Sequence, residues 1–206
     1  MIKPGNNFFI RQLLHYYVTW IVKRHFHDLK FDPVDVDPNK SILLIANHFS
    51  FWDSLILYII CCKLLKKNFY VMVREDTTVK FQYVKYGGAF SINKQSRDML
   101  QSLDYAAELL NDPQNLVLIF PQGKLYSNFV NTIQFEKGMT RVMEKAQGKF
   151  QLLFAATFVQ YLKHKKPTAT VYLQVELYTD KNFEDLKNAY QMHYDNAKLQ
   201  QTEIVI

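Results

Sequence analysis

Residues 41–60, SILLIANHFSFWDSLILYII, place one histidine and one aspartate, His48 and Asp53, in a largely apolar stretch. An imidazole can take up a proton near neutral pH, and a carboxylate on its other ring nitrogen fixes the tautomer and stabilises the imidazolium. Five positions is a poor interval for contact within one regular element, because a strand sends the two side chains to opposite faces and a helix sets them off a shared stripe. A working pair therefore needs a turn between the two residues.

The sequence around His48 supplies such a turn. Residues 41–46 form an apolar run of buried-strand length, and residues 53–65 begin with an acid and continue with a helical pattern. A corner between this strand and this helix would bring His48 and Asp53 together.

A second pair with the same spacing, His27 and Asp32, lies in different surroundings. Residues 28–38 read DLKFDPVDVDP, a proline-rich turn with no helix after it. We therefore expect no functional pairing of His27 with Asp32.

A second loop with chemical potential is GGAFSINKQSR, residues 87–97. Gly87 and Gly88 allow close approach of the backbone, and Lys94 with Arg97 place two cations beside a helix start. Two cations and a helix N-terminus favour a phosphate site. Taken alone, the same residues also suit a solvated helix end.

A third loop, FPQGKLYSN at residues 120–128, follows a buried apolar run. Pro121 is rigid and Gly123 is permissive, so the loop can turn sharply beyond a strand end. On its own it also reads as an ordinary turn.

Taken together and in this order, the three blocks resemble the glycerolipid acyltransferase family, which includes the lysophosphatidic acid acyltransferases of phospholipid synthesis. The first family block, Asn-His-x-Ser-x-x-Asp, is matched by Asn47, His48, Ser50 and Asp53. The second usually ends in an aromatic, an apolar pair, Asp and Arg, and is similar to Phe90, Ser91, Ile92, Asn93 and Lys94. The third, Phe-Pro-Glu-Gly-Thr-Arg-Ser, is similar to residues 120–127, and Gly138 in FEKGM looks like the glycine that follows it. The resemblance covers roughly residues 40–160.

The resemblance implies an acyltransferase that moves a fatty acyl group from a thioester, acyl-CoA or acyl-carrier protein, to a hydroxyl of a lysophospholipid or a glycerol-phosphate-like acceptor. His48 would be the general base and Asp53 its orienting carboxylate, with no cofactor and no metal beyond the thioester co-substrate. The expected substrate-binding residues are Asn47, Gly88, Lys94, Arg97, Pro121, Gln122, Gly123 and Lys124.

The third block departs from the family pattern. Gln122 replaces a carboxylate, while Lys124 and Leu125 replace Thr and Arg. A fourth family block, which usually contains a proline, is represented by a proline-free LLFAATF. These departures leave open a non-phosphate lipid acceptor, and also a family member that has lost activity.

Two function classes outside acyl transfer stay open. A serine hydrolase or thioesterase could use Ser50 or Ser54, although the chain has no Gly-x-Ser-x-Gly elbow. A non-enzymatic nucleic-acid or membrane-binding protein would suit the charge and the aromatic residues, but no nucleic-acid motif is present, and we expect no nucleic-acid partner.

The elements that must position these loops alternate between apolar runs and helical stretches. This order predicts an α/β fold, a single layered domain with a largely parallel sheet flanked by helices. In such folds functional groups gather beyond the strand ends. The expected strands are 41–46, 69–73, 89–92, 115–120, 152–160 and 168–178, and the expected helices are 53–65, 76–85, 96–112, 138–147 and 182–200, with residues 28–40 as a loop.

Composition limits the remaining possibilities. A chain of 206 residues is long enough for one domain with a substantial core. Its formal charge of +6 favours an anionic partner such as a phosphorylated substrate or a membrane surface. The only cysteines, Cys61 and Cys62, are adjacent in an apolar helix, so they suit a reducing compartment rather than a disulfide.

The N-terminus predicts an additional amphipathic helix over residues 8–26. Arg11, His15, Thr19 and Lys23 recur every four residues, and aromatic and aliphatic side chains cover the rest. This length and pattern favour a helix in a membrane interface, and hence a peripheral membrane protein on the cytoplasmic face. A helix packed on its own domain is the alternative. We expect residues 1–30 to be this helix and residues 31–206 the acyltransferase domain.

Overall fold

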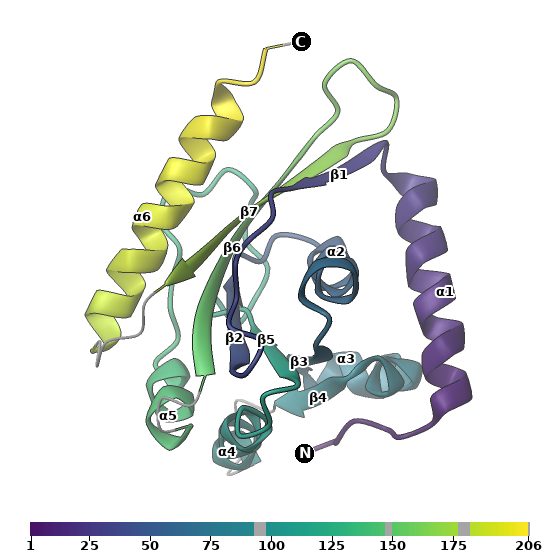
Figure 1. Cartoon of the computed structure of the whole chain (residues 1–206), viewed down its shortest axis with the longest axis vertical. Coiled ribbons are helices and arrows are strands. Elements are labelled where there is room, and N and C mark those ends of the chain that lie inside the picture. The colour runs from purple at the N-terminus through teal and green to yellow at the C-terminus, as the bar shows by residue number, and fades with distance from the viewer. Residues whose placement is uncertain (93–97, 147–149, 177–181, 206) are drawn as a thin grey trace.

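The computed structural model describes residues 1–92, 98–146, 150–176 and 182–205. They form a seven-stranded sheet in the order β1-β7-β6-β2-β5-β3-β4, with helices on both faces (Figure 1). The strands are β1 (Asp28–Phe31), β2 (Ser41–Ala46), β3 (Asn68–Arg74), β4 (Ala89–Ile92), β5 (Asn115–Ile119), β6 (Phe150–Gln160) and β7 (Thr168–Glu176). The helices are α1 (Phe8–His25), α2 (Trp52–Ile60), the π-helical turn η1 (Cys61–Leu65), α3 (Glu75–Lys80), the 3-10 helix η2 (Gln82–Gly87), α4 (Asp98–Leu109), α5 (Gly138–Lys145) and α6 (Phe183–Thr202).

The expected α/β fold with a largely parallel sheet is confirmed. Strands β2 to β6 all run in one direction, and the one antiparallel pairing among the described strands joins β6 to β7. The central strands β2 and β5 are buried along their whole length. Such burial suits parallel strands covered on both faces, and it explains why both sequences are continuous apolar runs.

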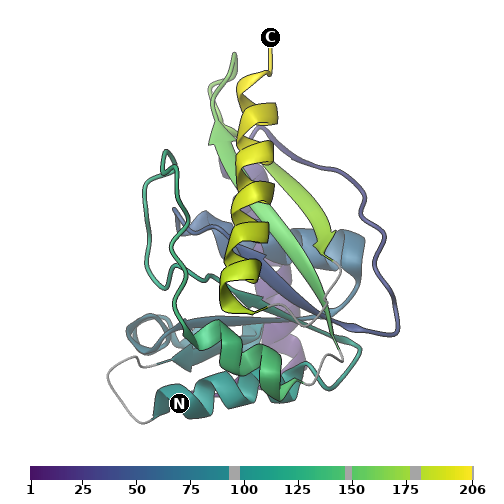
Figure 2. The same cartoon turned by 90° about the vertical axis from the view of Figure 1, so that its left-hand side faces the viewer.

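Side chains of β2 alternate between two hydrophobic cores. Leu43 and Ile45 pack with α4, α5 and α6, whereas Ile42, Leu44 and Ala46 pack with α1 and α2. Figures 1 and 2 show α6 and α1 on opposite faces of the sheet. The carboxyl end of β2 therefore lies between two packed layers, which fixes the position of the residues that follow it.

The segment 28–40 was expected to be a loop, but it contains β1 at the sheet edge. The His27 N–H donates to the Pro167 carbonyl oxygen at 2.8 Å, and β1 then pairs in parallel with β7. A four-residue strand that depends on a partner far along the chain has little local signal, since pairing rather than propensity stabilises it.

Two expected helices are each divided into an α-helix and a second helical segment of another type. Residues 53–65 divide into α2 and η1, which ends at Lys66 with φ of 52°. Residues 76–85 divide into α3 and η2, which ends at Gly88 with φ of 92°. A left-handed residue after a helix ends it by turning the chain away from the helix axis.

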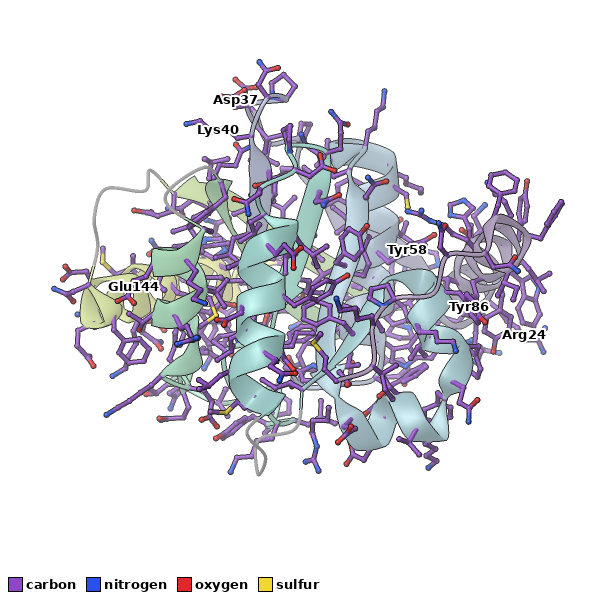
Figure 3. The ribbon with its side chains drawn as sticks, turned by 90° about the horizontal axis from the view of Figure 1, so that it is seen from below. Arg24, Asp37, Lys40, Tyr58, Tyr86 and Glu144 are labelled. Carbon is purple, nitrogen blue, oxygen red and sulfur yellow. The ribbon has the colours of Figure 1, made fainter. Side chains whose placement is uncertain are left out.

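Helix α1 spans nearly the expected range and packs on the domain by one face. Val22 and Phe26 join the core on the α2 side of the sheet. His15 and Thr19, members of the predicted polar stripe, are half-buried, and the His15 Nδ1 lies 3.1 Å from the hydroxyl of Tyr58. Figure 3 shows Tyr58 on the same side of the domain as Arg24 of α1. The polar stripe thus partly faces inward, because the Tyr58 hydroxyl needs a polar partner there.

The outer face of α1 is aromatic. Its exposed large side chains are Phe8, Phe9, Leu13, Tyr16, Tyr17 and Trp20. Over the described ranges, no helix combines the length and the apolar character needed to cross a bilayer.

Candidate active site

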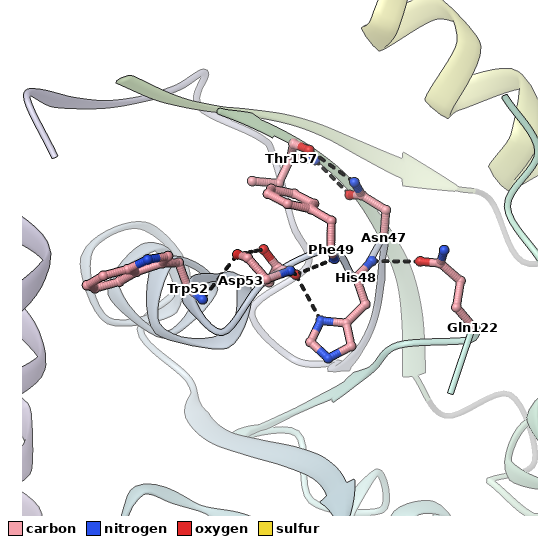
Figure 4. Close-up of polar contacts among 8 residues, drawn as sticks. Asn47, His48, Phe49, Trp52, Asp53, Gln122 and Thr157 are labelled. Atoms are coloured by element: carbon pink, nitrogen blue, oxygen red, sulfur yellow. Dashed lines mark hydrogen bonds and ion pairs between the residues drawn. The ribbon is translucent and has the colours of Figure 1, made fainter. Parts of the chain in front are cut away.

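His48 and Asp53 meet at the corner between β2 and α2, as their spacing predicts (Figure 4). The His48 Nδ1 lies 2.8 Å from the Asp53 Oδ2, while the histidine side chain is 24% exposed and the aspartate side chain is 0% exposed. The corner forms because β2 ends at Ala46 and Asp53 begins the first turn of α2. One partner is therefore accessible to a substrate, and the other is shielded from water.

The buried carboxylate of Asp53 is satisfied by hydrogen bonds from its own corner. Its Oδ2 accepts the N–H groups of Phe49 at 2.7 Å and Ser50 at 2.9 Å, and its Oδ1 accepts the Ser50 hydroxyl at 2.8 Å. The positive end of α2 adds further stabilisation of a negative charge. A charged Asp53 makes His48 Nδ1 the donor, which leaves Nε2 free to accept a proton.

The loop after β5 holds His48 from the other side. The Gln122 Oε1 accepts the His48 N–H at 2.6 Å, and the Tyr126 N–H donates to the His48 carbonyl oxygen at 3.0 Å. The ring of Phe120 stacks on the imidazole with centroids 4.0 Å apart and planes 15° apart. Backbone and ring of His48 are thus both fixed.

Asn47 joins the carboxyl end of β2 to β6. Its side-chain nitrogen donates to the Thr157 carbonyl oxygen at 3.0 Å, and its side-chain oxygen accepts the Thr157 N–H at 2.8 Å (Figure 4). Asn47 and Gln122 are both buried. These two residues, expected to bind substrate, direct their hydrogen bonds to the backbone beside His48 and so position it.

Other residues of the third block shape the loop. Pro121 is buried, and its carbonyl oxygen accepts the Glu136 N–H at 2.8 Å. Gly123 has φ of 63°, a left-handed conformation that favours glycine. Lys124 is exposed, with its Nζ 5.3 Å from the centroid of the Tyr126 ring. It is a cation available to an anionic ligand next to His48.

The second block is only partly described. Lys94 and Arg97 lie outside the described residues. Gly88 directly precedes the amino end of β4, and the strand register places it level with Leu43 in the middle of β2, about 16 Å from His48 along the strand direction. A Cβ at Gly88 would come within 2.0 Å of the Phe69 carbonyl oxygen. Close packing against β3 explains why a glycine stands here.

A cation outside the three motifs is Arg74, the last residue of β3. Because β3 and β2 run parallel in one sheet, Arg74 lies at the same end of the strands as His48. Its Nη2 donates to the Asp76 Oδ2 at 2.7 Å, and both side chains are mostly exposed. The sequence could have indicated Arg74, because it directly follows the expected strand 69–73 and functional groups gather beyond strand ends.

The second His–Asp pair does not form a comparable arrangement. The ring of His27 stacks on that of His164 with centroids 3.5 Å apart, and the contacts described for His27 do not include Asp32. The next element after Asp32 is strand β2 rather than a helix, in agreement with its proline-rich surroundings.

The structure does not favour Ser50, Cys61 or Cys62 as a nucleophile for His48. The Ser50 hydroxyl donates to Asp53 and accepts the Trp52 N–H at 3.1 Å, so its proton is directed away from the imidazole. Burial raises the pKa of the Cys61 thiol to about 12 and also raises the pKa of Cys62. Both thiols are therefore protonated and weakly nucleophilic near neutral pH.

A family model described as Acyltransferase matches residues 25–159, well over half of the 206-residue chain. The match includes the whole His48–Asp53 corner and the loop after β5. A comparison with curated proteins finds no match.

Proposed function

This chain belongs to the Acyltransferase family, and from that premise we propose that it moves a fatty acyl group from a thioester, acyl-CoA or acyl-carrier protein, to a hydroxyl of a lysophospholipid or glycerol-phosphate-like acceptor. The observation that carries the proposal is the His48–Asp53 pair, in which an accessible imidazole is bonded to a shielded carboxylate at 2.8 Å. This is the arrangement that general-base activation of a hydroxyl requires.

In the proposed reaction, the acceptor hydroxyl donates its hydrogen bond to the His48 Nε2. As the hydroxyl oxygen attacks the thioester carbonyl carbon, its proton moves to Nε2 and a new C–O bond forms. Collapse of the tetrahedral intermediate breaks the C–S bond, and the leaving thiolate takes the proton from the imidazolium. Asp53 stabilises the imidazolium between these two steps. The acceptor itself is the nucleophile, so no acyl-enzyme forms.

A phosphate on the acceptor is supported by the cations at this end of the sheet. Lys124 lies in the loop after β5 and Arg74 ends β3, and both side chains are exposed. Charge-assisted hydrogen bonds to a phosphate contribute about 1.5 to 3 kcal/mol each. The neutral amide of Gln122 does not argue for a neutral acceptor, because its oxygen binds the His48 backbone.

Peripheral attachment to a membrane, on its cytoplasmic face, is the second part of the proposal. Residues 8–26 would supply it, since the outer face of α1 exposes aromatic side chains, with Lys23 and Arg24 in its last turn. Aromatic rings suit the headgroup region, and the cations suit lipid phosphates.

The test of the catalytic proposal is His48→Ala, matched by His27→Ala. Loss of a general base costs about two to four powers of ten, and the oriented proton transfer is lost with it, so we expect the turnover of His48→Ala to fall at least about a thousandfold. His27→Ala should stay within about threefold of the unmodified protein, because the described contacts of His27 include no carboxylate partner of this kind. Release of product from a purified acyl-CoA and a lysophospholipid, followed by lipid mass spectrometry, provides the measurement. Near-normal acyl transfer by a folded His48→Ala protein would refute the mechanism.

A further inference from the structure

Three large apolar side chains next to His48 point into solvent. Phe51 is 63% exposed, Leu125 is 55% exposed and Phe129 is 84% exposed. We call Phe51, Leu125 and Phe129 the flanking surface. Isolated exposed apolar residues are common, and what distinguishes these three is their position near His48 and the hydrogen bonds that hold the loop of Leu125 and Phe129.

All three lie close to the candidate catalytic histidine. Phe51 follows His48 by three residues in the chain. Phe129 follows Tyr126 by three residues, and the Tyr126 N–H donates to the His48 carbonyl oxygen at 3.0 Å. Three residues span at most about 11 Å. Leu125 is adjacent to Tyr126 in the chain. The backbone of each of the three residues therefore lies near the corner that carries His48.

The loop that carries Phe129 is fixed on both sides of it. The Phe129 N–H donates to the Ser127 hydroxyl at 3.1 Å, and the Val130 carbonyl oxygen accepts the Tyr194 hydroxyl of α6 at 3.1 Å. The Lys198 Nζ donates to the Asn131 Oδ1 at 2.7 Å. These contacts hold the backbone that carries the exposed Phe129 ring.

Charge next to the flanking surface indicates what it contacts. Lys124 directly precedes Leu125. On the other side, the Phe51 ring lies 5.7 Å from that of Trp52, which in turn lies 5.0 Å from His25 in the last turn of α1, beside Lys23 and Arg24. Apolar rings bordered by cations complement a lipid monolayer, which offers acyl chains below a layer of phosphates.

We propose that the flanking surface inserts into a lipid monolayer and seats the His48 site directly on it. The residues that make this contact lie outside α1. Its purpose, which is to bring a lipid acceptor to His48, rests on the proposed function. A lipid acceptor would then reach His48 from the monolayer without passing through water.

The test compares two double variants. The loop variant combines Leu125→Ser and Phe129→Ser, which removes two side chains of the flanking surface. The α6 variant combines Met192→Ser and Leu199→Ser, which removes two side chains of similar exposure, 67% and 60%, from α6. Cosedimentation with vesicles of phosphatidylcholine and phosphatidylglycerol measures binding. The loop variant should bind about tenfold more weakly than the unmodified protein, and the α6 variant should stay within about twofold. Thermal unfolding of each variant checks its fold.

Activity provides a second measurement. On an acceptor embedded in vesicles, kcat/KM of the loop variant should fall about tenfold, while on a soluble short-chain acceptor it should stay within about twofold. Equal binding by the two double variants would overturn the proposal, because α1 would then carry the whole contact. Equal losses on both acceptors would also overturn it, since Leu125 and Phe129 would then act inside the site. If the protein transfers no acyl group at all, the catalytic proposal fails, but the vesicle measurement still decides this one.

Discussion

At the scale of single residues, Asp53 determines whether His48 can act as a base. Its two carboxylate oxygens accept hydrogen bonds from different donors. Oδ2 accepts the ring N–H of His48 and the backbone N–H groups of Phe49 and Ser50, and Oδ1 accepts the Ser50 hydroxyl. An Asn side chain can supply one oxygen to the Oδ2 donors and turn its NH₂ toward the hydroxyl of Ser50. It keeps the hydrogen-bonded geometry but cannot stabilise the imidazolium by charge.

This division of roles predicts a graded loss of activity. Asp53→Asn should fold and lose at least about a hundredfold in kcat, because the charge on the imidazole's partner is gone and the wrong tautomer becomes accessible. Ser50→Ala should lose only about tenfold, the effect of one hydrogen bond to the carboxylate. Steady-state kcat with saturating thioester measures both. Equal losses in the two variants would show that Asp53 is needed for the shape of the corner and not for its charge.

At the scale of secondary structure, a substitution at Gly88 can distinguish a role in packing from a role in substrate binding. Its φ of 92° and the 2.0 Å distance that would separate an added Cβ from the Phe69 carbonyl oxygen both exclude an ordinary side chain. Gly88→Ala should therefore destabilise the fold by about 1 to 3 kcal/mol. Gly87→Ala is a matched control, since a Cβ at Gly87 meets no heavy atom within 4 Å.

Urea unfolding measures both glycine variants. The midpoint of Gly88→Ala should drop clearly below that of Gly87→Ala. At a temperature where both are folded, the KM for the acceptor should match the unmodified value. A raised KM in a stable Gly88→Ala protein would instead restore this glycine to the substrate site.

The same elements show what the sequence could predict. The strands 41–46 and 115–119 were predictable because a strand buried on both faces reads as a continuous apolar run, and the His48–Asp53 corner followed from the strand-to-helix order around it. Strand β1 was not predictable from its own residues, because its pairing with β7 is purely tertiary. A motif also gives the spacing of residues but not the direction of their side chains.

That limit applies to residues whose side-chain contacts the sequence could not show. Asn47 and Gln122 belong to motifs that align with a substrate site, yet both side chains turn inward and bind the backbone. For Gly88 the sequence did give the position, because this glycine directly precedes the expected strand 89–92 and does not lie beyond its carboxyl end, where functional groups gather. The stacking of Phe120 on His48 needs the two loops in three dimensions and has no signal in either loop alone.

At the scale of the whole molecule, charge and apolar surface should act together on membrane binding. Phe9, Leu13, Tyr16 and Trp20 have the spacing of one helical stripe, and all four are exposed on α1. The formal charge of the chain is +6. Deleting residues 1–27 would not test this stripe cleanly, because it would also remove the buried Val22 and Phe26 from the core.

Substitution of the stripe alone is the cleaner test. Phe9→Ser, Leu13→Ser and Trp20→Ser together should leave thermal unfolding within a few degrees, because none of the three is in the core. Binding to vesicles that contain phosphatidylglycerol should fall at least about tenfold, since three large apolar side chains no longer leave water. For the unmodified protein, raising the salt from about 0.1 M to about 1 M shortens the Debye length from about 10 Å to about 3 Å and should weaken binding to anionic vesicles. Binding to purely phosphatidylcholine vesicles should change little with salt. If the triple variant bound anionic vesicles as tightly as the unmodified protein does, attachment would come from charge or from the flanking surface, and the outer face of α1 would not contribute to it.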